Sequence, residues 1–82
     1  MNIIELSNKN IIITGAGSGI GRETAIVASK LGAKTILLDI SEENLKETQT
    51  LLYGDGHSIF VTDLSQTENI ATIMKDIVSV YN

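Results

Sequence analysis

The apolar residues of this chain fall into three short continuous runs, and the segments between them carry helical spacing. The runs cover residues 10–14 (NIIIT), 34–40 (KTILLDI) and 58–62 (SIFVT), and polar residues bound them. A continuous apolar run of this length is typical of a strand buried on both faces of a parallel sheet. The pattern therefore predicts three strands.

The first segment between the runs predicts a helix over about residues 19–31. Glycine at position 32 then suits a left-handed C-cap. The positions that recur at helical spacing are Ile20, Thr24, Val27, Ala28 and Leu31.

Two further helices are predicted after the second and third runs. Ser41 is expected to cap a short helix whose inward residues are Leu45, Thr48 and Leu52. Residues 65–68 have capping-box spacing, so a third helix is expected from about residue 66. Its apolar stripe comprises Ile70, Ile73, Met74, Ile77, Val78 and Tyr81.

Strands that alternate with helices of this length predict parallel βαβ units with right-handed crossovers. The expected architecture is α/β, in the order β-α-β-α-β-α, with three layers and parallel strands in spatial order 3-2-1. The first two helices should share one face of the sheet, and the third should begin the crossover to the other face. The first strand is then an uncovered edge, so its expected neighbour is missing.

Composition limits the chain to one small acidic domain. It has 82 residues, 43% of them apolar and 20% charged, with no cysteine and a formal net charge of −4. These values exclude a multidomain enzyme, a disulfide scaffold and a zinc-thiolate module. They also leave no basic surface for nucleic acid or an anionic membrane, so small molecules or proteins are the expected partners. The first ten residues do not resemble an export signal, so a cytoplasmic location is expected.

A glycine cluster lies directly between the first predicted strand and the first predicted helix. It reads Thr14-Gly15-Ala16-Gly17-Ser18-Gly19-Ile20-Gly21. A strand-to-helix turn that binds an anion needs glycine to leave the strand, to let amides approach phosphate, and to pack helix on strand. The three glycines at positions 15, 19 and 21 suit those roles, with the spacing G-x-x-x-G-x-G. The alternative is a flexible glycine turn without a ligand.

Asp39 ends the second predicted strand, 24 residues after Gly15 (39 − 15 = 24). Distance and place both suit a carboxylate that accepts hydrogen bonds from the hydroxyls of an adenosine ribose. Such a carboxylate would repel a 2′-phosphate, which favours NAD over NADP. The alternative is a solvated aspartate at the strand end that caps the next helix.

Asp63 follows the third strand at the same edge of the sheet, where it could meet the amino group of adenine. A loop aspartate before the Ser65 cap is the alternative. His57 has no second histidine, cysteine or nucleophile beside it in the sequence, which indicates a surface residue rather than a catalytic or metal-binding group.

Together these motifs resemble the cofactor half of the short-chain dehydrogenase/reductase family. The pattern T-G-x-x-x-G-x-G is matched at Thr14, Gly15, Gly19 and Gly21, and Asp39 and Asp63-Leu64 stand where that family has its ribose and adenine contacts. The resemblance implies a Rossmann-type fold, NAD as cofactor and hydride transfer between nicotinamide and an alcohol or carbonyl carbon. The implied cofactor-binding residues are Gly15, Gly17, Ser18, Gly19, Ile20, Gly21, Asp39, Ile40, Asp63 and Leu64.

The family's catalytic asparagine, serine and Tyr-x-x-x-Lys residues have no counterpart in this sequence. Tyr53 is followed four places later by His57, and Tyr81 only by Asn82. Residues 1–82 are therefore expected to be a partial dinucleotide-binding domain, truncated before the fourth strand and inactive alone. A non-catalytic nucleotide-binding or sheet-edge dimerisation module, a homo-oligomer through the exposed first strand, is the alternative.

Overall fold

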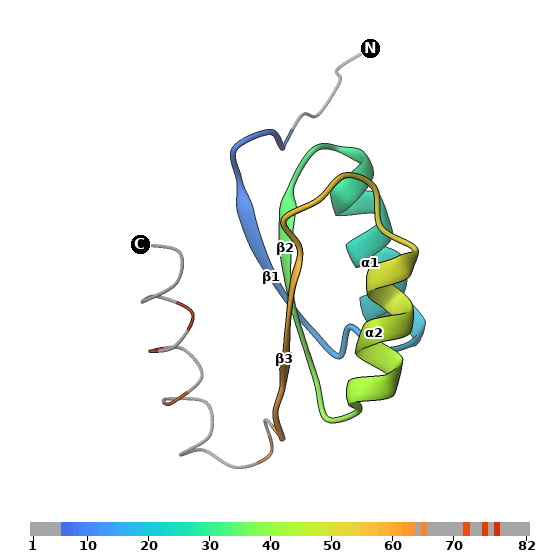
Figure 1. Cartoon of the computed structure of the whole chain (residues 1–82), viewed down its shortest axis with the longest axis vertical. Helices are drawn as coiled ribbons and strands as arrows, with labels where there is room; N and C mark the ends of the chain where they lie inside the picture. Colours follow the sequence, from blue (N-terminus) through green and yellow to red (C-terminus); the bar gives the residue numbers. More distant parts are fainter. Residues whose placement is uncertain (1–5, 64, 66–71, 73–74, 76, 78–82) are drawn as a thin grey trace.

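Three parallel strands and two helices make up the computed structural model over its described residues, which are 6–63, 65, 72, 75 and 77. Along the chain they are β1 (Asn10–Thr14), α1 (Gly19–Lys30), β2 (Lys34–Asp39), α2 (Glu42–Thr50) and β3 (Ser58–Val61) (Figure 1). These bounds agree with the sequence prediction to within a residue or two. The predicted third helix lies almost wholly outside the described residues.

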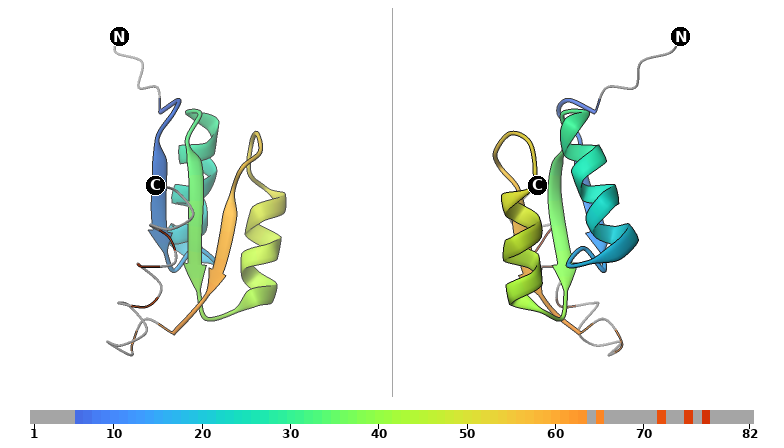
Figure 2. Two further views of the ribbon diagram at one scale, coloured as in Figure 1. Left: turned by 60° about the vertical axis from the view of Figure 1, so that its left-hand side comes forward. Right: turned by 90° about the vertical axis from the view of Figure 1, so that its right-hand side faces the viewer.

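The sheet has the order β1-β2-β3, with both pairs parallel. The register pairs Asn10 with Lys34 at one end of β1 and Thr14 with Leu38 at the other. This order confirms the prediction, which counted the same strands from the opposite edge. Helices α1 and α2 lie side by side on one face of the sheet, as expected for two successive crossovers in one direction (Figure 2).

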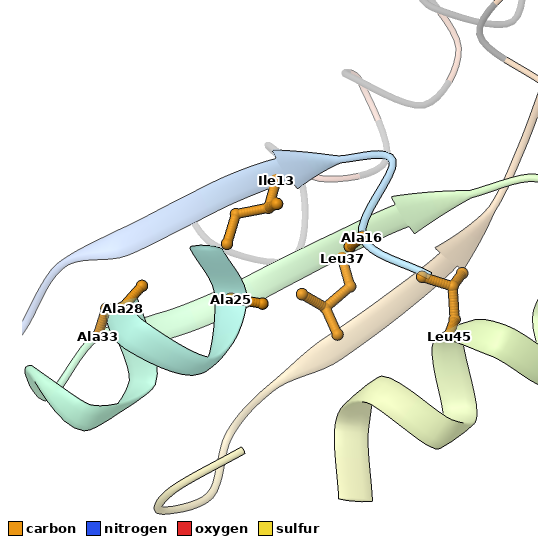
Figure 3. Packing of buried hydrophobic residues seen from close by; sticks show 7 residues of the cluster. All are labelled: Ile13, Ala16, Ala25, Ala28, Ala33, Leu37 and Leu45. Atoms are coloured by element: carbon orange, nitrogen blue, oxygen red, sulfur yellow. The ribbon is translucent and has the colours of Figure 1, made fainter. Parts of the chain in front are cut away.

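The main core lies between the sheet and this helical layer. Ile13 and Leu37 point from the strands toward the helices, and Leu45 meets them from α2 (Figure 3). Four buried alanines complete the cluster: Ala16, Ala25, Ala28 and Ala33. Because an alanine side chain is a single methyl group, α1 can approach the sheet closely. On the other face of β2, Ile36 and Leu38 pack with Ile77 and Phe60.

The helical spacing identified α1 but not its buried face. Of the five positions that gave the prediction only Ala28 is buried, and Ile20 and Val27 are 86% and 53% exposed. The small side chains of Ala25, Ala28 and Ser29 face the sheet instead. The larger apolar residues line a hollow of about 760 Å³ on the side of α1 that faces Leu6 and Ile11.

Strand β1 is less buried than its apolar run predicted. Ile13 is buried, whereas Ile12 is 40% exposed. The physical reason is the position of β1 at the edge, because within the described residues it pairs with β2 alone. The expectation of a strand buried on both faces is therefore wrong for β1 and correct for β2, which has four consecutive buried residues.

His57 is half-buried and fastens the connection between α2 and β3, which corrects the prediction of a surface residue. The backbone N–H of Thr35 donates to His57 Nδ1 at 3.0 Å, and His57 Nε2 lies 2.7 Å from the carbonyl oxygen of Tyr53. A backbone N–H can only donate, so Nδ1 is the acceptor and Nε2 carries the proton. Gln49 Nε2 donates to the His57 carbonyl oxygen at 2.8 Å, and this adds a contact from α2.

Candidate functional site

Three segments that are distant in sequence meet at the carboxyl edge of the sheet. They are the glycine turn after β1, the end of β2 and the residues that follow β3. A small hollow of about 190 Å³ lies between them, lined by Gly15, Leu38, Asp39, Ile40, Thr62 and Asp63. Open α/β sheets bind ligands outside the carboxyl ends of their strands, and the hollow occupies that position.

Two glycines of the turn are explained by geometry. Gly15 has φ +63°, in the left-handed region that a glycine adopts without strain, and it turns the chain sharply out of β1. Gly21 lies where α1 passes over this turn, and a Cβ atom there would come within 2.1 Å of the Gly15 carbonyl oxygen. Helix and turn could not pack this closely with any other residue at position 21.

The amino terminus of α1 points its backbone N–H groups toward the turn. Ser18 is the N-cap residue, and its side chain makes no capping hydrogen bond. No acidic residue lies in the first turn of the helix. The first N–H groups of an α-helix have no partner within the helix, and the helix dipole favours an anion at this end. The start of α1 is therefore suited to a phosphate.

Asp39 is tied to the glycine turn through its side chain. Its Oδ2 accepts from the Gly17 backbone N–H at 2.9 Å, and its Oδ1 accepts from the Ser41 N–H at 3.2 Å. Partial burial acts to raise the pKa of Asp39, but the backbone amides of Gly17, Ser41 and Ile40 outweigh it and hold the pKa below 3.8. The carboxylate is therefore ionised at neutral pH and fixed beside the hollow.

Ser41 also caps α2, as the sequence predicted. Its hydroxyl accepts from the Asn44 N–H at 3.2 Å. One Asp39 oxygen accepts from the Ser41 amide at the start of α2, and the other accepts from the Gly17 amide in the turn. Asp39 can therefore support the start of α2 and also bind a ligand at the turn.

Asp63 lies across the hollow from the glycine turn and organises its own loop. Its Oδ1 accepts from the Ser65 hydroxyl at 2.6 Å and from the Ser65 N–H at 2.9 Å. These two bonds, from the hydroxyl first and the amide second, lower the pKa of Asp63. Ile40 is well exposed at the rim of the hollow. Leu64, the remaining predicted contact, lies outside the described residues.

Arg22 joins the turn to α2, a role that was not predicted from the sequence. Its guanidinium donates to the Gly17 carbonyl oxygen, to Thr48 Oγ1 and to Glu47 Oε1, at 2.6, 2.8 and 2.7 Å. Arg22 and Glu47 thus form an ion pair. A cation near the positive end of a helix is unfavourable without a partner. The placement of Arg22 in the first turn of α1 was the signal that could have revealed the bridge.

The described part of the chain offers two other negative observations. It contains no group of three or more histidine, cysteine or acidic side chains that could hold a metal ion. Neither of its helices has the length and apolar character that crossing a bilayer requires. The larger hollow along α1 is lined mainly by apolar residues and includes neither Asp39 nor Asp63, so the candidate site is the smaller hollow at the carboxyl ends of the strands.

Fold and site together define a parallel α/β sheet of the class that binds ligands at the carboxyl ends of its strands. The chain belongs to the short chain dehydrogenase family, whose model matches residues 9–82. It is 42% identical over 69 residues to estradiol 17-beta-dehydrogenase 11 of Homo sapiens, an alignment that covers 82% of this chain and 23% of the human protein. The chain therefore spans about a quarter of the length of this relative.

Solved structures of similar proteins have the same fold over nearly the whole chain. The citronellol catabolism dehydrogenase of Pseudomonas aeruginosa PAO1 superposes with a TM-score of 0.85 at 31% identity, over 99% of this chain and 35% of that one. A protein of Escherichia coli CFT073, described as a short chain dehydrogenase and complexed with NADPH, gives a TM-score of 0.86 at 30% identity, over 96% and 35% of the two chains. The family confirms a nicotinamide dinucleotide as the cofactor class but leaves NAD and NADP open.

Proposed function

We propose that this chain is the NAD-binding part of an oxidoreductase, and that residues 1–82 are a partial dinucleotide-binding domain. The observation that carries the proposal is the Asp39 carboxylate, fixed at the rim of the hollow by the Gly17 amide. A charged acceptor at this point suits the two hydroxyls of an adenosine ribose. The glycine turn beside it provides the close backbone approach that a pyrophosphate needs.

The proposal assigns a role to each segment of the edge. Backbone amides of Ser18, Gly19 and Ile20 at the start of α1 face the pyrophosphate, and the Gly17 amide holds the Asp39 carboxylate. The glycines at 15 and 21 shape the turn that brings those amides together. Ile40 flanks the adenine ring, and Asp63 with Leu64 contacts its edge.

The proposed cofactor preference is NAD over NADP. A 2′-phosphate would come against the ionised carboxylate of Asp39, and like charges in a partly buried site repel strongly. Two related structures contain NADP or NADPH, so membership of the family does not by itself select NAD. This chain has isoleucine at position 40 and serine at position 18, so neither neighbour of the site supplies a cation for that phosphate.

We also propose that the whole protein acts on an alcohol or a carbonyl compound. The dinucleotide, when bound, supplies or accepts the hydride, and the protein orients it and manages the proton. The printed sequence contains no Tyr-x-x-x-Lys segment for the proton. We therefore expect the 82-residue chain to bind the cofactor without turning over a substrate.

The test is a calorimetric titration of the purified chain with NAD and with NADP. We expect weak binding of NAD, weaker binding of NADP, and loss of the difference in Asp39→Ala. Asp55→Ala is the matched control, because it removes an exposed carboxylate at the opposite ends of the strands, near Lys34.

Two outcomes contradict the proposal. A folded chain that binds neither dinucleotide would show that residues 1–82 alone do not form a working NAD site. An unchanged preference in Asp39→Ala would show that another group discriminates between the cofactors.

The proposal includes a cytoplasmic location and self-association through β1. Ile12 is partly exposed on this strand, and β1 has one partner among the described strands. An unpaired edge can pair with a second copy of itself.

The acidic charge argues against nucleic acid and anionic membranes as partners. Cell fractionation tests the location.

A further inference from the structure

Arg22 and Thr48 form a bridge between α2 and the glycine turn that the proposed cofactor contacts do not include. Arg22 Nη2 donates to the Gly17 carbonyl oxygen at 2.6 Å, and Arg22 Nε donates to Thr48 Oγ1 at 2.8 Å. Thr48 Oγ1 donates in turn to the Ala16 carbonyl oxygen at 2.7 Å. Two successive carbonyl groups of the turn are therefore held, that of Ala16 by Thr48 of α2 and that of Gly17 by Arg22 of α1.

These bonds fix the direction of two backbone N–H groups. In a planar trans peptide the C=O and the N–H of the same unit point in opposite directions. The Ala16 carbonyl shares its peptide unit with the Gly17 N–H, which donates to Asp39 Oδ2 at 2.9 Å. The Gly17 carbonyl shares its unit with the Ser18 N–H, so the bond from Arg22 points that N–H away from the Arg22 guanidinium.

The bridge is buried at Thr48, where it contacts the turn, and exposed where Arg22 meets Glu47. Thr48 is 0% exposed, and the side chain of Arg22 is 20% exposed. Hydrogen bonds that are shielded in this way are costly to lose, because the remaining partner stays unsatisfied. The Glu47 carboxylate that pairs with Arg22 is 61% exposed, and exposed ion pairs contribute little.

We propose that Arg22 and Thr48 are positioning residues for the dinucleotide site. They hold the Ala16–Ser18 backbone so that the Gly17 amide binds the Asp39 carboxylate and the Ser18 amide faces the ligand. Neither side chain needs to touch the cofactor. The inference deepens the proposed function and rests on it.

The test compares four variants of the purified chain. Thr48→Val removes the hydroxyl without changing charge, and Arg22→Lys keeps the charge but loses the planar fork that reaches Gly17 and Thr48 at once. Glu47→Gln is the matched control, because it breaks only the exposed ion pair. Thr48→Ser restores the hydroxyl and is the rescue variant. Circular dichroism and thermal unfolding verify that each variant is folded.

Two quantities are measured: the affinity for NAD by calorimetry, and the titration midpoint of the Asp39 carboxyl group by ¹³C NMR without ligand. We expect Thr48→Val and Arg22→Lys to weaken NAD binding about tenfold. We expect the Asp39 midpoint to rise toward its ordinary value in both. Glu47→Gln and Thr48→Ser should change the affinity less than about twofold and leave the midpoint unchanged.

The result that overturns the inference is an unchanged Asp39 midpoint in folded Thr48→Val and Arg22→Lys. A midpoint that shifts while NAD affinity stays the same also overturns it, because the turn would then not depend on the bridge for binding. If the unaltered chain does not bind NAD, the proposed function fails separately. The NMR titration still decides whether the bridge positions the turn.

Discussion

Asp39 links the chemistry of the site to the stability of the fold. Its carboxylate accepts hydrogen bonds from the amides of Gly17 and Ser41, which join the glycine turn and α2 to the end of β2. A charge that is held in this way stabilises the folded state only while it is ionised. The same group that would bind a ribose therefore also holds the edge of the sheet together.

This gives a pH dependence of stability. Because the pKa of Asp39 in the folded state lies below 3.8, its contribution is complete above that pH and is lost as the pH falls through the folded-state pKa. Urea unfolding of the chain and of Asp39→Asn from pH 3 to pH 7 should show a stability difference that is largest at neutral pH and shrinks in acid. Asp55→Asn is the control for removing a carboxylate elsewhere. A difference that does not change with pH would contradict this account.

Gly21 gives a second prediction at the scale of one residue. Gly21→Ala adds a Cβ atom that would meet the Gly15 carbonyl oxygen, so α1 must move away from the turn. Helix propensity alone favours alanine over glycine by about 1 kcal/mol, so a loss of stability in this variant would have to come from the clash. We expect overpacking to cost about 1–3 kcal/mol in thermal unfolding. NAD binding should weaken as well.

The matched control is Glu23→Ala in the same helix, where the side chain is exposed. It should change stability by less than about 0.5 kcal/mol. Equal stability of Gly21→Ala and the unaltered chain would mean that the turn accommodates the methyl group.

At the scale of elements, the connection between α2 and β3 depends on His57. The ring accepts from the buried Thr35 backbone amide and approaches the Tyr53 carbonyl, so it joins β2 to the loop. His57→Ala leaves the Thr35 amide without this acceptor, and we expect a loss of about 1–3 kcal/mol in the free energy of unfolding. ¹⁵N NMR of the unaltered chain should find the neutral imidazole with Nδ1 unprotonated and Nε2 protonated. The opposite tautomer would contradict the assigned hydrogen bonds.

The elements could be predicted from the sequence because their boundaries are marked locally. The glycine cluster begins α1, Gly32 follows it in the left-handed region with φ +100°, and Ser41 caps α2. The face that α1 buries was not predictable in the same way. Ile20 and Val27 are the more hydrophobic residues, but the close approach of helix to sheet selects the small side chains.

The candidate site could be predicted in part for the same reason. Gly15, Asp39 and Asp63 were placed at one edge because parallel strands bring their carboxyl ends together. The bridge from Arg22 to Thr48 depends on how α1 packs beside α2, and this contact cannot be predicted from the local sequence of either helix. Its residues are 26 positions apart.

At the scale of the whole molecule, the chain exposes apolar surface on α1 and at the edge of β1. Contiguous apolar surface of this kind favours association. Since the chain spans about a quarter of a relative such as the human protein, the surface it exposes need not be exposed in a longer protein.

Ile12→Lys tests association through β1. A charged residue on an edge strand opposes pairing with another edge, and the position is already 40% exposed. Sedimentation velocity should find a smaller average size for this variant than for the unaltered chain at the same concentration. Ile13→Lys is the matched control, because it places the charge in the core and should unfold the chain. An unchanged size distribution in Ile12→Lys would assign any association to another surface.

The network around His57 lies at the opposite end of the strands from the glycine turn. The loop there carries Asp55, which is exposed and lies near the start of β2, whereas Asp39 lies at its end. The sequence contains no cysteine, so Asp55→Cys would provide a single thiol. A thiol-reactive fluorescent label would then attach at position 55 alone. Such a probe could report unfolding while leaving the dinucleotide edge chemically untouched.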